Sequence, residues 1–345
     1  MNNMDKNVHE LEEQIESLKK ELAMLKHEIH ADVSIVVAVT DNEEALKDCL
    51  DILLMQSLIS IEIICIYSGS SERIINMLRR YSAADNRIIV YYVTDKGMDR
   101  IFQYGIRFSG SEYITFLSVN CWYADENVLE ALYKTARENG AYACGGDSRV
   151  FGAKATEKNT PEGFCKYRDL GSDEILSCYL FKKSEIAAKV NELPELLYYY
   201  AKPFTMTLLN ETDRIYKINR TVCVRRALKE SEAEDIYLCA ELENNISELT
   251  LRSVADHLNS AEYSLAYAEK NLLERDYSDV YKNLLQKEQL LAVGEFYRAE
   301  NPQIVKSVKR INDMMDITVL EKEDVYSYEN MYHIALFETI RGAGS

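Results

Sequence analysis

The residues best placed for chemistry follow the ends of apolar segments that have the composition of buried strands. Residues 113–117 form one such segment, which stops at Ser-Val-Asn-Cys (118–121), just before the only tryptophan, Trp122. In open α/β sheets, ligands bind at the carboxyl ends of the strands. This end supplies an amide and a thiol, but no carboxylate, histidine or glycine-rich loop. We therefore expect a ligand crevice whose loop carries no charge.

Four apolar segments alternate with segments of helical periodicity in the first part of the chain. Strands are expected at 33–39, 61–67, 87–93 and 112–117, and helices at 43–58, 73–83, 99–108 and 125–138. Continuous apolar runs are typical of strands buried on both faces of a parallel sheet. Alternation with helices predicts right-handed crossovers and a doubly wound, mostly parallel α/β sheet. The loops after the strands are then expected to converge on one edge.

Composition excludes several classes of function. The chain has 345 residues, 47% hydrophobic and 28% charged, with a net charge of −17. That acidity disfavours binding to nucleic acid or to anionic lipid, since both need a basic face. We expect no transmembrane segment and no secretory signal. The eight cysteines form no C-x-x-C pair. Scattered buried thiols of this kind favour a reducing cytoplasm over disulfides or a zinc site.

Two further regions flank this α/β segment. Residues 8–29 carry a heptad that predicts a parallel two-stranded coiled coil, and hence a homodimer, or else a helix packed on its own domain. Its a positions are Val8, Ile15, Leu22 and Ile29, and its d positions are Leu11, Leu18 and Leu25. Beyond about residue 227 helical periodicity replaces the strands. We therefore divide the chain into a coiled-coil helix (1–31), an α/β domain (32–227) and a helical C-terminal region (228–345).

Three segments carry a resemblance to a known family. They are VSIVVAVTDNEEALKDCLDILLMQSL (33–58), IEIICIYSGSSE (61–72) and SEYITFLSVNCWYADENVLEALYKTARENGA (111–141). With them, residues 32–226 resemble the family 2 glycosyltransferases of the GT-A fold, especially bacterial enzymes that build surface polysaccharides. The resemblance implies a nucleotide-sugar site, hexosyl transfer, and Mn²⁺ or Mg²⁺ as the cofactor if the protein is active.

The functional positions of that family are altered in this chain. Ser68 stands where the resemblance implies an aspartate that holds the base, and residues 118–121 stand where an Asp-x-Asp motif holds the metal. Tyr200 and Ala201 occupy the acidic pair that supplies the general base. Divalent cations prefer hard anionic oxygen, and a tyrosine hydroxyl is a weak base at neutral pH. The sequence thus assigns no catalytic residue and no metal ligand. The vestigial nucleotide-binding positions are Thr40, Glu43, Ser68, Asn120 and Arg225, the last of which could contact phosphate or simply close the last strand on the surface.

Three functions remain open from the sequence. The first is a catalytically inert glycosyltransferase-like binding or scaffold subunit in glycan assembly, whose partner could be an active glycosyltransferase. The second is an active enzyme that uses displaced carboxylates, although the position of Asp41 and Asp125 favours a helix cap or first-turn acid over a ligand. The candidates near the expected crevice are Asp41, Asp95, Asp99, Asp125, Asp147 and Asp173. The third is a carbohydrate-binding module with stacking faces from Tyr91, Tyr92, Tyr104, Tyr123 and residues 198–200.

Overall fold

The structure is a computed structural model. It describes residues 31–226, except 96, 153–160, 171–175, 197–199 and 211, together with residues 246–273, 275–276 and 280. The predicted helix at 1–31 and the proposed dimer contact at 8–29 lie outside the described residues, apart from residue 31.

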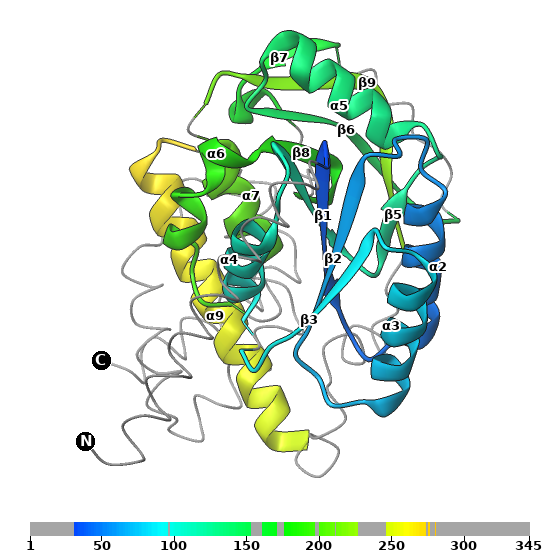
Figure 1. The fold of residues 1–345 in the computed structure, drawn as a ribbon. Helices are drawn as coiled ribbons and strands as arrows, with labels where there is room; N and C mark the ends of the chain where they lie inside the picture. The colour runs from blue at the N-terminus through cyan, green and yellow to red at the C-terminus, as the bar shows by residue number, and fades with distance from the viewer. Residues whose placement is uncertain are drawn as a thin grey trace, which may run out of the picture.

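The first half of the domain is a set of parallel strands with helical crossovers. The strands are β1 (Val33–Val39), β2 (Ile61–Tyr67), β3 (Ile88–Tyr92) and β4 (Tyr113–Ser118), in the order β3-β2-β1-β4. The helices are α2 (Glu43–Leu54), α3 (Glu72–Ala84) and α4 (Met98–Phe108). Figure 1 shows α2 and α3 on one side of these strands and α4 on the other. The predicted doubly wound α/β sheet is confirmed here.

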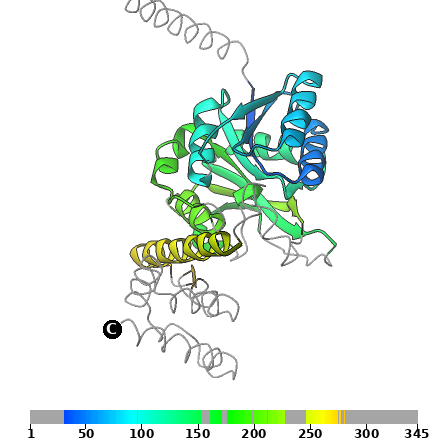
Figure 2. The same cartoon turned by 90° about the horizontal axis from the view of Figure 1, so that it is seen from below.

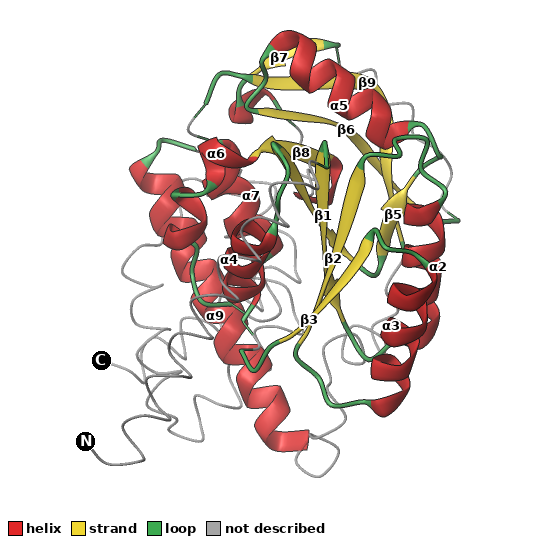
Figure 3. Ribbon diagram, viewed as in Figure 1, coloured by secondary structure: helices red, strands yellow, loops and turns green. Residues whose placement is uncertain are grey.

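The second half turns this sheet into a mixed one. Its strands are β5 (Cys121–Tyr123), β6 (Ala143–Val150), β7 (Gly163–Cys165), β8 (Tyr179–Lys182) and β9 (Ile215–Arg225). The sheet order is β3-β2-β1-β4-β8-β6-β9-β5, with β7 also on β9, as Figure 3 lets the reader follow. β8 runs antiparallel to β4 and β6, whereas β9 is parallel to β6. The helices are α5 (Val128–Asn139), α6 (Lys183–Ile186) and α7 (Ala201–Leu209), with the short 3-10 helices η1 (Tyr167–Asp169), η2 (Leu176–Cys178) and η3 (Lys189–Glu192).

Two predicted helices have different bounds for local reasons. The helix expected to reach residue 58 ends at Leu54, and the Gln56 side chain turns away to accept from Leu129 N at 3.2 Å. The helix expected from residue 125 begins at Val128, because residues 121–123 form β5 and Asp125 Oδ1 accepts from Asn127 N at 2.9 Å. A side-chain turn of this kind favours a non-helical backbone ahead of the helix.

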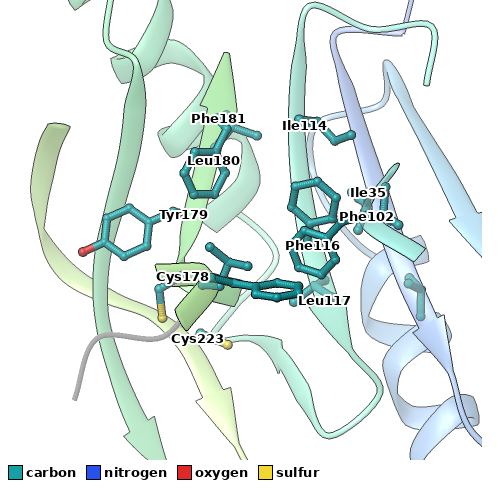
Figure 4. Packing of buried hydrophobic residues seen from close by; sticks show 14 of the residues in the cluster. Ile35, Phe102, Ile114, Phe116, Leu117, Cys178, Tyr179, Leu180, Phe181 and Cys223 are labelled. Carbon is teal, nitrogen blue, oxygen red and sulfur yellow. The ribbon is translucent and has the colours of Figure 1, made fainter. Parts of the chain in front are cut away.

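The hydrophobic core lies between the sheet and its helices (Figure 4). Phe102 of α4 stacks on Phe116 of β4 with ring centroids 3.9 Å apart. Gly105 lets α4 approach β1 closely, because a Cβ there would lie 2.7 Å from Val36 Cγ2. This contact fixes α4 beneath the carboxyl ends of β1 and β4.

One described helix belongs to the C-terminal region. Figure 2 shows α9 (Ile246–Lys270) in yellow alongside the part of the domain coloured green. Leu258 and Leu265 are buried in the shared core, and the Tyr263 and Thr207 hydroxyls are 2.8 Å apart, which ties α9 to α7. The division at residue 227 stays a prediction. Among the described residues, no helix has the length and apolar character needed to span a membrane.

Candidate functional site

The carboxyl ends of β1, β2 and β4 place three predicted positions at one edge of the sheet. Val39 pairs with Tyr67, and Ala38 pairs with Ser118. The next residues, Thr40 and Ser68, therefore emerge beside the loop that joins β4 to β5. The structure brings these vestigial nucleotide positions together, as parallel-strand geometry requires.

The loop at the predicted metal position is closely packed. Val119 is 1% exposed and Asn120 is 7% exposed, so the amide side chain is not presented to solvent. The backbone of Asn120 donates to Ser118 Oγ at 3.4 Å and accepts from Arg226 N at 2.9 Å. A hydroxyl, a buried amide and a thiol do not fit Mn²⁺ or Mg²⁺, which select anionic oxygen. Within the described ranges, no group of three His, Cys, Asp or Glu side chains could hold a metal ion.

A buried tyrosine, Tyr67, joins the loops around the position expected to bind the nucleotide base. Tyr67 Oη donates to the Asp41 carboxylate and accepts from Ser71 N at 2.9 Å. A Cβ at Gly69 would lie 2.4 Å from Tyr67 Oη, so glycine leaves room for that ring. Asn42 Oδ1 caps α2 by accepting from Ala45 N at 2.9 Å, and Glu43 in the first turn lies 3.7 Å from Arg73. The side chains here mainly hold the loops to one another.

The predicted general-base position faces the same crevice. Tyr200 and Ser118 line one small pocket, together with Ser177, Met98 and the Phe102 ring. Tyr200 is half-buried, and its ring packs edge-to-face against the Phe102 ring with the ring centroids 6.4 Å apart. Ala201 is the exposed first residue of α7. The pocket is largely apolar, and none of the residues that line it carries a carboxylate.

Two arginines end the last strand, and they differ in their partners. Arg226 lies 2.8 Å from Asp48 and places its guanidinium 5.9 Å from the centre of the Trp122 ring. Arg225 stands opposite Cys121, and its buried Nε has no hydrogen-bond acceptor. An N–H without an acceptor can bind an anionic oxygen, so Arg225 is the better candidate for a phosphate contact.

Comparison with known proteins agrees with this geometry. Residues 34–194 match the family model described as Glycosyl transferase family 2. Residues 34–194 are a family 2 glycosyltransferase domain. EpsH of Bacillus subtilis (strain 168), named as a glycosyltransferase, is 30% identical over 104 residues, which is 30% of this chain and 30% of EpsH. The "Uncharacterized glycosyltransferase EpsJ" of the same strain is 23% identical over 252 residues, which is 68% of this chain and 69% of EpsJ.

A solved structure shows the same fold as this glycosyltransferase domain. S. aureus TarS 1–349 in complex with UDP-GlcNAc superposes with a TM-score of 0.56 at 13% identity, covering 90% of this chain and 92% of that one. At this identity the likeness is one of fold alone. The predicted GT-A arrangement is thus confirmed, while the match to EpsH spans 30% of that protein's length.

Among the displaced carboxylates, two lie on loops at the crevice edge. Asp41 follows β1 and accepts from Tyr67, and Asp95 follows β3 and accepts from the Tyr104 hydroxyl. Asp147 of β6 lies 3.3 Å from the buried Lys217 ammonium, so a cation already neutralises it. Asp173 lies outside the described residues.

The prediction that Asp125 lies near the crevice is wrong. β5 carries the chain away from the β4 loop, and the Asp125 carbonyl accepts from Gln56 Nε2 at 3.0 Å, just past the end of α2. α2 begins beside the crevice and is 12 residues long, so its end is roughly 18 Å away. There the Asp125 carboxylate pairs with Arg220 at 2.7 Å.

Most of the tyrosines proposed to stack on sugars are buried or packed against other side chains of the protein. Tyr123 is 1% exposed, which rules it out as a binding face. Tyr91 and Tyr104 stack on Phe108, with ring centroids 3.9 and 5.6 Å away. Tyr92 is 50% exposed, and Tyr198 and Tyr199 lie outside the described residues. The described geometry therefore gives little support to a carbohydrate-binding module.

Three cysteines that are far apart in the sequence lie close together in the structure. Cys121, Cys178 and Cys223 come from β5, η2 and β9, and Cys121 and Cys178 both raise the pKa of Cys223. Their positions in the sequence give no signal of this, because the contact depends on the pairing of β5 with β9.

Asp99 gives a test of the electrostatics at the start of α4. It is 4% exposed, its Oδ1 has no hydrogen-bond partner, and burial raises its pKa. The charged carboxylate therefore costs stability above its ordinary pKa, and this cost disappears as the pH falls below it. We expect Asp99→Asn to stabilise the protein at pH 7 by about 1 kcal/mol, roughly 2–4 °C in Tm. Calorimetry from pH 7 down to pH 3 checks this; an equal gain at every pH would contradict it.

Proposed function

We propose that this glycosyltransferase domain has lost efficient sugar transfer and acts as a binding or scaffold subunit in bacterial glycan assembly. The observation that carries the proposal is the crevice itself. Its metal position holds Ser118 and Asn120, and its general-base position holds Tyr200 and Ala201, so neither supplies a carboxylate. Sugar transfer requires a cation that stabilises the negative charge on the leaving diphosphate. It also requires a base that deprotonates the acceptor hydroxyl. Loss of one such electrostatic group typically costs about 10²–10³-fold in rate.

The backbone arrangement around the crevice supports binding of a nucleotide better than catalytic sugar transfer. The loops that contain Thr40 and Ser68 lie at the carboxyl ends of the parallel strands. The buried Nε–H of Arg225 could donate a hydrogen bond to a phosphate. UDP-GlcNAc, the ligand of the TarS structure, is a reasonable first probe of such a site. A homodimer through residues 8–29, an active glycosyltransferase as partner and a cytoplasmic location belong to the same proposal.

Calorimetric titration of the full chain with UDP and UDP-GlcNAc, with and without Mn²⁺, tests this proposal. We expect no tightening by Mn²⁺ and no release of UDP from UDP-GlcNAc above the buffer rate. Any binding that occurs without metal is expected to weaken in Arg225→Gln and to persist in Arg220→Gln, an arginine on the same strand that is paired with Asp125. Mn²⁺-dependent binding with UDP release would instead establish an active transferase.

One carboxylate favours that second candidate function, an active enzyme with displaced residues. Asp41 is half-buried at the crevice edge, close to the start of α2. If it substitutes for a lost metal or base ligand, Asp41→Asn will abolish Mn²⁺-dependent UDP release. Retention of that release in Asp41→Asn would exclude it from this role.

A further inference from the structure

Two strands bring a pair of thiols to the loop at the vestigial metal position. In the antiparallel pairing of β5 with β9, Cys121 stands opposite Arg225 and Tyr123 stands opposite Cys223. Opposite residues and residues two apart share one face of a sheet. Cys121 and Cys223 are therefore diagonal neighbours on the same face, with Arg225 next to both.

The two thiols lie close enough to affect each other's ionisation. Cys223 and, to a smaller extent, Ser177 of η2 lower the pKa of Cys121, while the Cys223 thiol donates to the Val224 carbonyl at 3.9 Å. Cys178 also raises the pKa of Cys223, and Figure 4 shows these two side chains near each other within the core. Cys121 is partly exposed, whereas Cys223 is fully buried. A small oxidant would thus meet Cys121 first.

The surroundings distinguish Cys121 from the other thiols. Cys223, then Ser177 and the Arg225 charge, hold the pKa of Cys121 below its ordinary value. The nearby Cys121 and Cys178 thiols, together with burial, raise the pKa of Cys223. Burial raises the pKa of Cys65 and Cys144 to about 12. Because the thiolate is the nucleophile, Cys121 is the reactive member of the pair.

We propose that Cys121 and Cys223 form a reversible disulfide when the protein meets hydrogen peroxide, and that this pair is a thiol-oxidation site of the domain. The Cys121 thiolate attacks one peroxide oxygen, forming an S–O bond and breaking the O–O bond, and the hydroxide released takes up a proton to become water. The Cys223 sulfur then attacks the Cys121 sulfenic acid, forming the S–S bond and releasing a second water. Two thiols and one peroxide thus give one disulfide and two waters. A dithiol reductant reverses the reaction.

The strand geometry allows this bond with a small movement. Diagonal neighbours in a flat antiparallel pair have Cα atoms about 7–8 Å apart, and disulfides need less than about 7 Å. β5 is a three-residue strand at the end of the sheet order. A short edge strand can close this gap more easily than a central one. The closure would fix β5 to β9 beside Arg225, whatever ligand the crevice takes.

Peptide mapping of the full chain tests the proposal. The reduced protein is treated briefly with hydrogen peroxide, alkylated under denaturing conditions and digested without reductant. We expect two of the eight thiols to escape alkylation. One linked peptide pair, joining Cys121 to Cys223 and lighter by two hydrogen atoms, is expected to dominate and to disappear after dithiothreitol. In native protein before oxidation, alkylation of Cys121 is expected to be about tenfold faster than that of Cys65 or Cys144.

Matched variants separate this pair from general oxidation. Cys121→Ser and Cys223→Ser are expected to remove the linked peptide, and Cys65→Ser, a buried thiol on β2, is expected to keep it. The wild-type map is decisive without any variant. A dominant Cys178–Cys223 link, full alkylation of all eight thiols, or the same mixture of links from native and unfolded protein would each overturn the proposal.

Discussion

Replacement of Lys217 by alanine is expected to lower the free energy of unfolding by about 3–5 kcal/mol, because it leaves a partly buried carboxylate without its cation. Lys217 is 1% exposed, and its ammonium lies 3.3 Å from Asp147 Oδ1. The same ammonium is 5.8 Å from the centre of the Tyr179 ring, which adds a cation–π contact. The pair joins β9 to its neighbour β6, so the loss destabilises the second half of the sheet.

Urea unfolding followed by the fluorescence of Trp122, the only tryptophan, measures this effect. Arg220→Ala is the matched control, because Arg220 lies on the same strand and pairs with Asp125 near the surface at 2.7 Å. An exposed pair of this kind is expected to contribute at most about 1 kcal/mol. Lys217→Met combined with Asp147→Leu is expected to recover most of the loss, since no unpaired charge remains. Equal losses in Lys217→Ala and Arg220→Ala would contradict the assignment of Lys217 as a buried charge.

Replacement of Asp276 by alanine is expected to lower the free energy of unfolding by about 2–4 kcal/mol. Asp276 follows α9, is 1% exposed and accepts from Tyr167 Oη at 2.9 Å. It also pairs with Lys202 of α7, so one carboxylate joins η1, α7 and the end of α9. Burial, together with this carboxylate, raises the pKa of Tyr167, which keeps the phenol protonated as a donor.

Hydrogen exchange of the amides in 258–273 checks that prediction beside the unfolding curve. Asp276→Ala is expected to raise exchange in this segment more than in β1 or β2. Asp276→Asn keeps an acceptor for Tyr167 and loses the charge pairing with Lys202 and Arg275, so its loss is expected to be about half as large. Unchanged exchange in 258–273 would show that the carboxylate does not hold α9 to the domain.

The strands of the first half could be predicted because their signal is local. Residues 33–39 and 61–67 are continuous apolar runs, and both strands have the predicted bounds. The absence of carboxylates at 68 and 118–121 could also be read directly, because these positions follow such strands in the sequence, whereas 200–201 are identified through the family resemblance. Parallel pairing then brings Thr40, Ser68 and Ser118 to one edge without further information.

The second half could not be predicted, because its structure depends on pairing between distant residues. β6 contains Gly145 and Gly146, where added Cβ atoms would lie 2.4 Å from Tyr179 and 2.6 Å from the Arg220 carbonyl. Glycines weaken the strand signal in the sequence while making close packing possible. The position of Asp125 and the proximity of Cys121 to Cys223 could not be predicted for the same reason. Both depend on the pairing of β5 with β9.

The position of β9 also affects how the protein is made on the ribosome. β9 pairs with β5, β6 and β7, yet it ends at residue 225, about 100 residues after β5 ends at residue 123. At roughly 5–20 residues per second, synthesis leaves β5 without this partner for about 5–20 s. During that interval the nascent chain exposes strand edges that can pair with other chains. Substitutions that weaken β9 are therefore expected to reduce yield in cells more than their effect on the finished protein would indicate.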